Sequence, residues 1–368
     1  MPRVQAEVLI QFGQALLQSL GGPTEEASLV ARLLVDANLS GHDSHGVIQI
    51  PAYLEAYTEG LIAPGAGFTR ERDTPTTALI DAHWGFGHRL AYEAMQLAID
   101  KARECGISAV GAYHCYHVGH LGAYALLAAE AGMVGMIAVN DGGGGQRVVP
   151  HGGVAGRLST NPLAVGAPTG TTEPFILDMS TSVVAEGKVR LKRLQGEPMP
   201  LGWMIDALGR ATTDPEDFFR LTGNLLPFGG ALRYKGYGLA LAVELLAGIL
   251  GRAGHSRAEI PPYNNGFFAI VIDISRFLPL EEFTAAVRGL IAYIKSCPRD
   301  SAVDEIVYPG ERAAHTRLYR RRHGIEIDPD VAPFTNCRPG ACHSGARQCL
   351  IRHTKYAAPA WRRHSLQR

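Results

Sequence analysis

The chain has 368 residues, and its 35 lysines and arginines balance its 35 aspartates and glutamates. The charges are unevenly spread: residues 331–368 hold seven basic side chains and no acidic one, which leaves 28 basic and 35 acidic side chains in residues 1–330. This acidic body disfavours nucleic-acid binding, which needs clustered lysine and arginine to neutralise phosphates. The 46% hydrophobic composition excludes disorder of the whole chain and suffices for one large domain or two ordinary ones.

Secretion and membrane insertion are also disfavoured. Glu7, Gln11 and Gln14 interrupt the apolar residues near the start, so the pattern is not that of a secretory signal. The longest apolar stretch, residues 239–250, is well short of the roughly 20 residues that span a bilayer. The six cysteines include no C-x-x-C pair. We therefore expect a cytoplasmic protein with reduced thiols and no zinc site.

The first half of the chain predicts helices that alternate with buried strands. Pro23 and Thr24 precede two glutamates and a run of apolar residues at helical spacing, which stops at Ser40 and Gly41. Two helix-to-strand units follow, and they favour an α/β sheet. The predicted elements are a helix over 23–40, a helix over 88–104, a strand over 107–112, a helix over 122–131 and a strand over 133–139.

After Asn140 the pattern changes to short strands separated by glycine and proline, which favours antiparallel or mixed pairing over regular βαβ crossovers. No apolar period is present in residues 331–368, for which we predict disorder. The predicted elements of this part are strands over 163–165 and 175–177, a helix over 236–250, a strand over 267–274 and a helix over 280–296.

A polar loop follows the first predicted helix, and it contains His42, Asp43, Ser44 and His45 before Gly46. A histidine suits proton transfer near neutral pH, and a neighbouring serine can orient it. The alternative is an ordinary turn, because serine, aspartate and glycine are common turn residues. The motif alone does not decide between a catalytic loop and a turn.

Three histidines, His114, His117 and His120, fall at the strand-to-helix turn after residue 112, where α/β sheets often bind ligands. No H-E-x-x-H pattern accompanies them, so anion or carbonyl recognition is a better interpretation than a metal site. The glycine run 142–145 fits neither a Rossmann fingerprint nor a Walker loop. It is either a flexible turn or a place where the backbone approaches a ligand closely.

Two further clusters suit anion binding, one around residues 178–188 and one at the start of the helix predicted over 236–250. For the second cluster, tight glycine packing at a helix entry is an equally good interpretation. Together the clusters resemble the malate/L-lactate dehydrogenase family of NAD(P)-dependent 2-hydroxyacid dehydrogenases, which lacks a Rossmann domain. The matching segments, in chain order, are Asp43–Val47, His117–Gly119, Asn140, Thr160–Pro162, Asp178–Ser182, Gly187–Lys188, Pro200–Trp203, Pro227–Gly230, Lys235–Leu239 and Pro309–Glu311.

The resemblance implies an α/β (α+β) fold whose mostly antiparallel or mixed cofactor-binding sheet is flanked by helices. It implies an NAD(P)-binding domain over 76–279, a helical domain for substrate and dimerisation from residues 1–75 and 280–330, and a homodimer. Residues 331–368 match nothing in the family. The implied activity is hydride transfer between NAD or NADP and the 2-oxo carbon of a small 2-oxo or 2-hydroxy acid, malate- or lactate-like. The alternatives are a cyclic-imine reductase and a catalytically inactive dinucleotide-binding protein.

The resemblance also implies roles for individual residues. His45 is the acid/base with Ser44 and Asp178 as its partners, while the histidine matching His117 contacts substrate and is the alternative proton-transfer group. The substrate set also includes Gln49, Gly119, Leu121 and Arg147. No metal is implied. The cofactor set comprises Thr160, Asn161, Asp178, Met179, Ser180, Thr181, Ser182, Lys235, Gly236, Pro309, Gly310 and Glu311.

The chain departs from the family where charge is expected. Many members carry an arginine that grips the substrate carboxylate where this chain has Gln49, and arginine is also common where it has His120. Phe267 follows Gly266, at a position where many members of the family have a histidine after the glycine. Glutamine can hydrogen-bond a carboxylate but brings no charge. We expect Arg147 to supply the missing charge and the substrate pocket to differ from those of the ureidoglycolate and piperideine-carboxylate enzymes.

Deletion of residues 338–368 tests the separation of the acidic body from the basic tail. We expect the truncated protein to keep its catalytic activity, because the family resemblance ends before this segment. The measurement is specific activity after purification. Loss of activity in a truncation that stays folded and in solution would contradict the separation.

Overall fold

The structure is a computed structural model that describes residues 3–259, 261 and 263–327. The predicted disorder of residues 331–368 therefore lies outside the described residues. Within them, no helix combines the length and the apolar character needed to cross a membrane. Cys105, Cys115 and Cys297 form no disulfide in this part of the chain.

Seven strands form the central sheet, in the order β2-β3-β4-β11-β5-β6-β7. All neighbouring pairs are antiparallel except β3 and β4. The expectation of a mostly antiparallel, mixed sheet is confirmed. The strands are β2 (Thr69–Asp73), β3 (Thr77–Gly85), β4 (Ile107–Cys115), β11 (Asn265–Asp273), β5 (Met133–Asn140), β6 (Leu163–Ala167) and β7 (Phe175–Met179).

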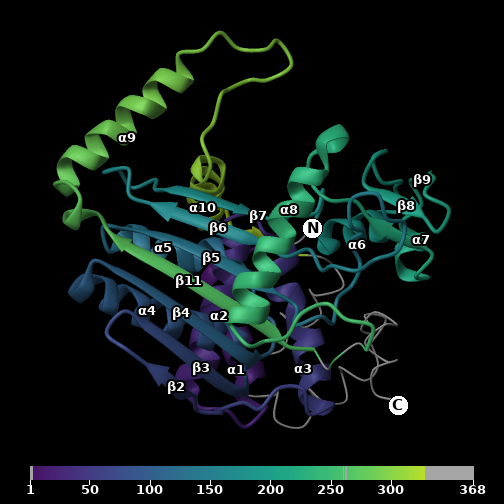
Figure 1. Ribbon diagram of the computed structural model, residues 1–368, viewed down its shortest axis with the longest axis horizontal. Helices are drawn as coiled ribbons and strands as arrows, with labels where there is room; N and C mark the ends of the chain where they lie inside the picture. Colours follow the sequence, from purple (N-terminus) through teal and green to yellow (C-terminus); the bar gives the residue numbers. More distant parts are fainter. Residues whose placement is uncertain (1–2, 260, 262, 328–368) are drawn as a thin grey trace.

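Strand β11 holds this sheet together, because it comes from late in the chain and inserts between β4 and β5 (Figure 1). It pairs along most of its length with both neighbours. The two helix-to-strand units of the sequence therefore do not lie next to each other. Strands β4 and β5 follow each other in the sequence, but in the sheet they are separated by β11, which comes more than 120 residues later.

The helices predicted from apolar periodicity are all present, although the last turns of the helix over 236–250 are a π-helix. These elements are α2 (Thr24–Leu39), α4 (Gly87–Cys105), α5 (Gly122–Glu130), α8 (Tyr234–Val243) with the π-helical η4 (Glu244–Leu250), and α9 (Leu280–Lys295). The sequence interpretation missed α1 (Ala6–Gln18), α3 (Ile50–Thr58), α6 (Glu186–Gln195), α7 (Pro215–Phe219), α10 (Glu311–His323), and the short helices η1 (Asp43–His45), η2 (Val47–Gln49), η3 (Gly230–Leu232) and η5 (Ile274–Arg276).

Helix α10 was missed because it has no apolar period. All of its last four residues, Arg320–His323, are basic. Its arginines instead pair with the N-terminal helical region, where Arg317 contacts Asp36 and Arg320 contacts Asp43. Polar helices of this kind are fixed by tertiary contacts rather than by an amphipathic pattern.

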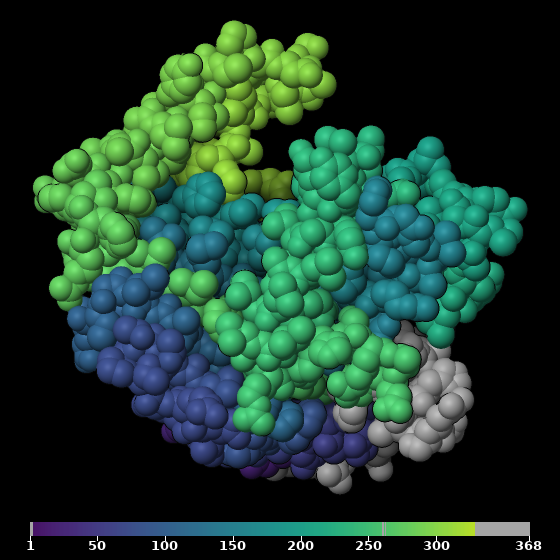
Figure 2. Space-filling model, viewed as in Figure 1, coloured from purple at the N-terminus to yellow at the C-terminus, as the bar shows by residue number. Residues whose placement is uncertain are grey.

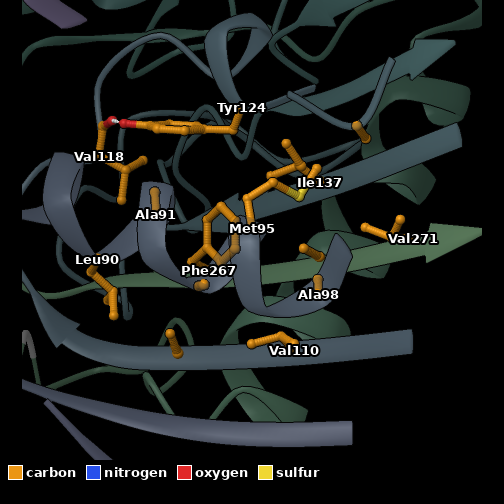
Figure 3. Close-up of a cluster of buried hydrophobic side chains, with 14 of the residues drawn as sticks. Leu90, Ala91, Met95, Ala98, Val110, Val118, Tyr124, Ile137, Phe267 and Val271 are labelled. Carbon is orange, nitrogen blue, oxygen red and sulfur yellow. Dashed lines mark hydrogen bonds between the residues drawn. The ribbon is translucent and has the colours of Figure 1, made fainter. Parts of the chain in front are cut away.

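The main core lies between the sheet and helices α4 and α5 (Figure 3). Ala91, Met95 and Ala98 of α4 face Val110 of β4 and Val271 of β11. A glycine lets helix α5 pack closely on the sheet. A Cβ on Gly166 of β6 would lie 2.2 Å from the carbonyl oxygen of Ala125 in α5. Close packing, more than apolar bulk, therefore sets the distance between α5 and the sheet.

A second core joins the two ends of the described chain. Strand β1 (Arg3–Val4) pairs with β12 (Ile325–Glu326), and Ile325 and Ile327 are buried with residues of α1, α2 and α3. The two ends of the described chain thus pack together with these helices, and the division into domains stays a prediction. Helix α9, which the predicted helical domain includes, extends outward in Figure 1.

A third unit, beside the central sheet, contains a small antiparallel sheet in the order β10-β8-β9 together with α6 and α7. Its strands are β8 (Met204–Asp206), β9 (Ala211–Thr212) and β10 (Gly223–Leu225). Arg147 is buried here. Its guanidinium donates hydrogen bonds to the carbonyls of Phe218 (Nη2) and Gly223 (Nη2, 2.8 Å) and lies 4.2 Å from the centre of the Phe218 ring.

The glycine run packs against the protein's own backbone. A Cβ on Gly142 would lie 2.6 Å from the carbonyl oxygen of Asn264, and one on Gly143 would lie 2.2 Å from that of His255. Both glycines have positive φ, +52° and +95°. The run therefore packs closely on the backbone at His255 and Asn264, and a close approach to a ligand stays a prediction.

Gly166→Ala tests the close packing of α5 on the sheet. Its new methyl group has no room, so we expect the free energy of unfolding to fall by about 1–3 kcal/mol. Chemical denaturation measures this change. Gly289→Ala in α9 is the control, because a Cβ there meets nothing within 4 Å; it should leave stability unchanged or raise it by up to about 1 kcal/mol. Equal stability of the two variants would contradict the packing argument.

Candidate functional site

The loop that carries His45 is held in place by its neighbours on both sides. Asn38, at the end of α2, donates from Nδ2 to Asp43 Oδ1 (2.7 Å) and accepts at Oδ1 from the backbone N–H of Val47 (2.9 Å). Gly46 has to be glycine here, because a Cβ would lie 2.2 Å from Asn38 Oδ1. From the other side, Arg320 of α10 forms an ion pair with Asp43. The predicted catalytic loop is thus a turn whose conformation is fixed by contacts with Asn38 and Arg320.

Within this loop, Ser44 and His45 form the predicted pair. Ser44 Oγ lies 3.0 Å from His45 Nδ1, and Gln49 donates from Nε2 to the Ser44 carbonyl (2.6 Å). Gly187, just before Lys188 in α6, packs directly on Ser44, since a Cβ there would lie 2.4 Å from Ser44 Cβ. Gln49 therefore shapes the loop from within, and its amide nitrogen is already engaged.

His117 lies in the turn after β4, next to His45. The two imidazole rings are stacked with their centres 5.6 Å apart. The buried hydroxyl of Tyr53, from α3, lies 2.8 Å from His117 Nδ1. This contact directs the other ring nitrogen, Nε2, away from Tyr53. Two imidazoles from sequence-distant segments therefore lie together, as proton transfer to a substrate oxygen requires.

Asp178 stands at the end of edge strand β7 and points toward the turn that carries His120. Its Oδ2 accepts from the backbone N–H of Gly122 (2.7 Å) and lies 3.2 Å from His120 Nε2. The His120 ring stacks on His42 with centres 4.1 Å apart. The loop after α2, the turn after β4 and strand β7 thus meet at one carboxylate.

The electrostatics of this cluster follow from burial. Burial raises the pKa of Asp178, while the imidazoles of His42 and His45 and the backbone N–H groups of Gly122 and Leu121 oppose the shift. Burial lowers the pKa of His45, and the charge of Asp178 opposes that shift in turn. Burial also lowers the pKa of His42 to about 4 and that of His120 to about 3. Asp178 and His45 are therefore suited to share one proton among otherwise neutral imidazoles.

A large cleft opens beside this cluster, with a volume of about 1560 Å³. Figure 2 shows the face of the molecule hollowed between α9 and α8, with part of α10 visible in the hollow. The cleft itself is lined by α10, β7, the start of α9 and the loop after α2. Lys188, in the first turn of α6, and Arg312, in the first turn of α10, both line the cleft and place positive charge near His42. Helix N-termini and cations together favour anions. The residues that line the cleft around the cluster include His42, His120, Gly122, Asp178, Lys188, Pro309, Gly310 and Arg312.

Of the predicted cofactor residues, Pro309 and Gly310 line this cleft together with Asp178. Glu311 is buried and forms an ion pair with Lys295, and it also accepts from the backbone N–H of Tyr308 (3.1 Å). Its carboxylate therefore fixes the start of α10. Lys235 is exposed at the start of α8.

Several other predicted residues are engaged with the chain itself. Asn161 is fully buried, and its Nδ2 donates to Glu244 Oε1 (2.9 Å) and to the Ala240 carbonyl (3.1 Å). The Thr160 carbonyl accepts from the backbone N–H of Thr181 (2.9 Å), and the hydroxyls of Ser180 and Ser182 donate to the carbonyls of Ser182 and Val184. Met179 is the last residue of β7 and is half-buried. These residues shape the wall next to Asp178.

Gly236, Gly119 and Leu121 have packing roles in this structure. A Cβ on Gly236 would lie 2.3 Å from the Phe228 carbonyl oxygen, as tight packing at a helix entry predicts. Gly119 has φ of +79° and packs on His88, while Leu121 is buried in the main core. The expectation that Arg147 replaces the missing substrate charge is not supported, because its guanidinium is bound to carbonyls in the third unit.

Sequence reasoning missed His88, which is buried beside His117 with ring centres 6.1 Å apart. Neither of its ring nitrogens has a hydrogen-bond partner in the described part of the chain. Gly87 lets α4 begin here, since a Cβ would lie 2.0 Å from the Tyr116 carbonyl oxygen. A histidine inside an amphipathic helix gives no signal of its own. Lys188 and Arg312 were likewise visible only once their helices were placed around the cleft.

Comparison with known proteins agrees with this arrangement. The family model for malate/L-lactate dehydrogenase matches residues 4–333. The chain belongs to the malate/L-lactate dehydrogenase family. It is 40% identical to malate dehydrogenase of Pyrococcus horikoshii over 337 residues, which cover 88% of this chain and 91% of that protein. It is 35% identical to L-sulfolactate dehydrogenase of Methanothermobacter thermautotrophicus, with 89% and 93% covered.

The solved structures confirm the fold of this family member. Malate dehydrogenase from Pyrococcus horikoshii superposes with a TM-score of 0.81 at 37% identity, covering 92% of this chain and 96% of that one. Delta1-piperideine-2-carboxylate reductase from Pseudomonas syringae superposes with a TM-score of 0.78 at 29% identity, covering 91% and 99%. The family therefore joins dehydrogenases of hydroxy acids to a reductase of a cyclic imine on one fold.

His88→Leu tests the cost of burying neutral imidazoles. Burial lowers the pKa of His88 to about 3, whereas an unfolded histidine titrates near 6.5. Below about pH 6.5 the unfolded chain takes up a proton at His88 that the folded protein does not. The free energy of unfolding is therefore highest above about pH 6.5 and falls by up to about 1.4 kcal/mol per pH unit as pH falls toward 3. We expect His88→Leu to lose less stability than the wild type between pH 6.5 and 4.5.

Urea denaturation at several pH values measures this difference. His151→Leu, which alters an exposed imidazole, is the matched control. The same dependence of stability on pH in the wild type and in His88→Leu would show that the burial of His88 does not contribute to acid lability.

Proposed function

We propose that this protein is an NAD(P)-dependent dehydrogenase that transfers hydride between the nicotinamide and the 2-oxo carbon of a small 2-oxo or 2-hydroxy acid, malate- or lactate-like. The observation that carries the proposal is the contact of His45 with Ser44 and His117 on a loop whose His42, together with His120 and Asp178, lines one large cleft. Its membership of a dehydrogenase family supports the reaction class. The names of the relatives support small hydroxy acids as substrates.

The cleft fits a dinucleotide in size and charge. Its volume of about 1560 Å³ exceeds that of a typical small-ligand pocket. Lys188 and Arg312, at the N-termini of two helices that line the cleft, suit a pyrophosphate. The bound cofactor supplies or accepts the hydride; the residues of the chain bind, orient and move the proton.

In this proposal His45 donates a proton to the substrate oxygen during reduction and takes it back during oxidation. Ser44 Oγ, 3.0 Å from Nδ1, orients the ring, and the charge of Asp178 favours its protonated form against burial. Tyr53 holds His117 where it can contact the same oxygen. His117 remains the alternative proton-transfer group, because its ring also lies beside His45.

His45→Ala tests the acid/base assignment. We expect turnover to fall by roughly 100-fold or more, the usual loss for a general acid/base, while NAD(P)H still binds, as measured by its fluorescence. Thermal unfolding should be close to that of the wild type. His117→Ala is the companion variant, and a near-normal rate in His45→Ala with a lost rate in His117→Ala would transfer the role to His117.

A substrate panel separates the alternatives. NADH and NADPH oxidation is followed with oxaloacetate, pyruvate and the cyclic imines Δ1-pyrroline- and Δ1-piperideine-2-carboxylate. We expect turnover on the 2-oxo acids, and the preferred cofactor is read from the same panel. Turnover only on imines would favour the reductase alternative, to which the imine-reductase neighbour lends support. Cofactor binding with no turnover on any compound would favour an inactive dinucleotide-binding protein.

We also propose that the protein is a homodimer, because two apolar surfaces of the described chain are exposed. Leu245, Ile249 and Leu250 of η4 are 59%, 54% and 60% exposed, and Leu290 and Tyr293 of α9 are 59% and 78% exposed. Apolar patches of this kind are typical of interfaces. Light scattering after size exclusion should give twice the chain mass. A monomer at micromolar concentration would contradict the proposal, and Ile249→Glu should weaken a dimer.

A further inference from the structure

His120 lies in the site next to Asp178 and lines the cleft. Its Nε2 lies 3.2 Å from Asp178 Oδ2, and its side chain is only 8% exposed. The same carboxylate oxygen accepts the N–H of Gly122. Stacking on His42, with centres 4.1 Å apart, fixes the plane of the His120 ring. His120 and Asp178 therefore lie side by side in the wall of the cleft.

The chemistry of this contact differs from that of an arginine. Because burial keeps the imidazole neutral, one ring nitrogen carries a proton and the other does not. A carboxylate only accepts, so the nitrogen that faces Asp178 is the protonated one, and Nδ1 carries the lone pair. Nδ1 has no partner in the part of the chain that the structure describes. His120 thus offers Asp178 a donor without a net charge.

We propose that His120 is a positioning residue of the proposed dehydrogenase, which holds Asp178 Oδ2 beside the Gly122 N–H so that the carboxylate faces His45. The inference rests on the proposed function. A neutral donor stabilises the carboxylate less than a guanidinium would. Asp178 therefore stays basic enough to share the proton that His45 transfers, and an arginine at this position would draw the carboxylate toward itself.

Several other charged or titratable groups surround this pair and have to stay constant in any test. They are His42 and His45 on the loop after α2, Asp36 on α2, Lys188 on α6, and Arg312 and Arg317 on α10. Arg317 is already paired with Asp36, and Lys188 and Arg312 face His42. Substitution at His120 alone leaves all of them in place.

The test is a series at this one position: His120→Gln, a neutral donor; His120→Leu, which has no donor; and His120→Arg, a charged donor. The readout is the acidic limb of the pH profile of kcat/KM for oxidation of the hydroxy acid, which needs the Asp178–His45 pair to have lost its shared proton. We expect the limb of His120→Gln to match that of the wild type. It should move to higher pH in His120→Leu and to lower pH in His120→Arg, with about one pH unit or more between the two extremes.

A second readout does not depend on turnover. The ring carbon signals of His45 in unliganded protein labelled with ¹³C-histidine, assigned by their loss in His45→Ala, are followed by NMR as pH is changed. The His45 midpoint should move in the same order across the series. Equal midpoints and equal acidic limbs in all four proteins would overturn the role of His120.

The proposed function and the role of His120 fail in different ways. Absence of turnover in the wild type with an ordered shift of the His45 midpoint would remove the dehydrogenase proposal and leave the contact with Asp178 intact. Thermal unfolding shows whether each variant is folded. If His120→Leu does not fold, the comparison of His120→Gln with His120→Arg still decides the result.

Discussion

The carboxylate of Asp178 is buried near the end of edge strand β7, where it lies beside His120, accepts from the Gly122 backbone and interacts electrostatically with His45. A buried carboxylate is costly unless donors surround it. Here two backbone N–H groups and the nearby imidazoles supply them, and none of these partners is a fixed charge. In the proposed mechanism, a proton shared with His45 balances the charge of this cluster. The other features of the site serve to hold this carboxylate and that imidazole together.

The sheet brings the partners together from distant parts of the chain. β7 is an edge strand, and the turn that carries His117 and His120 follows β4, on the other side of β11 and β5. Gly122 opens α5 directly after that turn, so the same short segment supplies His120 and the backbone donor to Asp178. Tight glycine contacts at Gly87, Gly166 and Gly187 set the distances between these segments. Packing precision at these glycines is thus part of the construction of the site.

Much of the fold was predictable from the sequence, for physical reasons. Helices such as α2 and α4 bury one apolar face, and strands such as β5 are apolar runs between turn residues, so local pattern reveals them. The position of β11 was not predictable, because strand order is set by pairing over a distance of more than 100 residues. Helix α10 was missed because its contacts are ionic, as in the pairs Arg317–Asp36 and Arg320–Asp43.

In the candidate site, too, some residues were predictable from the sequence and others only from the three-dimensional arrangement. The resemblance to a family pointed to Ser44, His45, His117 and Asp178, and the structure brings all four to one region. The role expected of Arg147 was wrong in place, because proximity in sequence to the glycine run does not determine where its side chain is bound. Lys188 and Arg312 became visible only in three dimensions, where two helix starts meet at the cleft.

Gln49 and His120 bring no fixed positive charge to the site. Gln49 is bound to the Ser44 carbonyl, and His120 is neutral, so the positive charge near the site is carried by Lys188 and Arg312. Both lie toward the cleft, where the cofactor is proposed to bind.

The most direct measurement follows the hydride itself. The enzyme is supplied with NADH or NADPH in which both hydrogens at C4 of the nicotinamide are deuterium, together with pyruvate or oxaloacetate, and the product is analysed by mass spectrometry and NMR. The account predicts a 2-hydroxy acid with deuterium bonded to C2 and a solvent proton on its oxygen. A product without deuterium at C2, or no conversion of any 2-oxo acid with either cofactor, would contradict it.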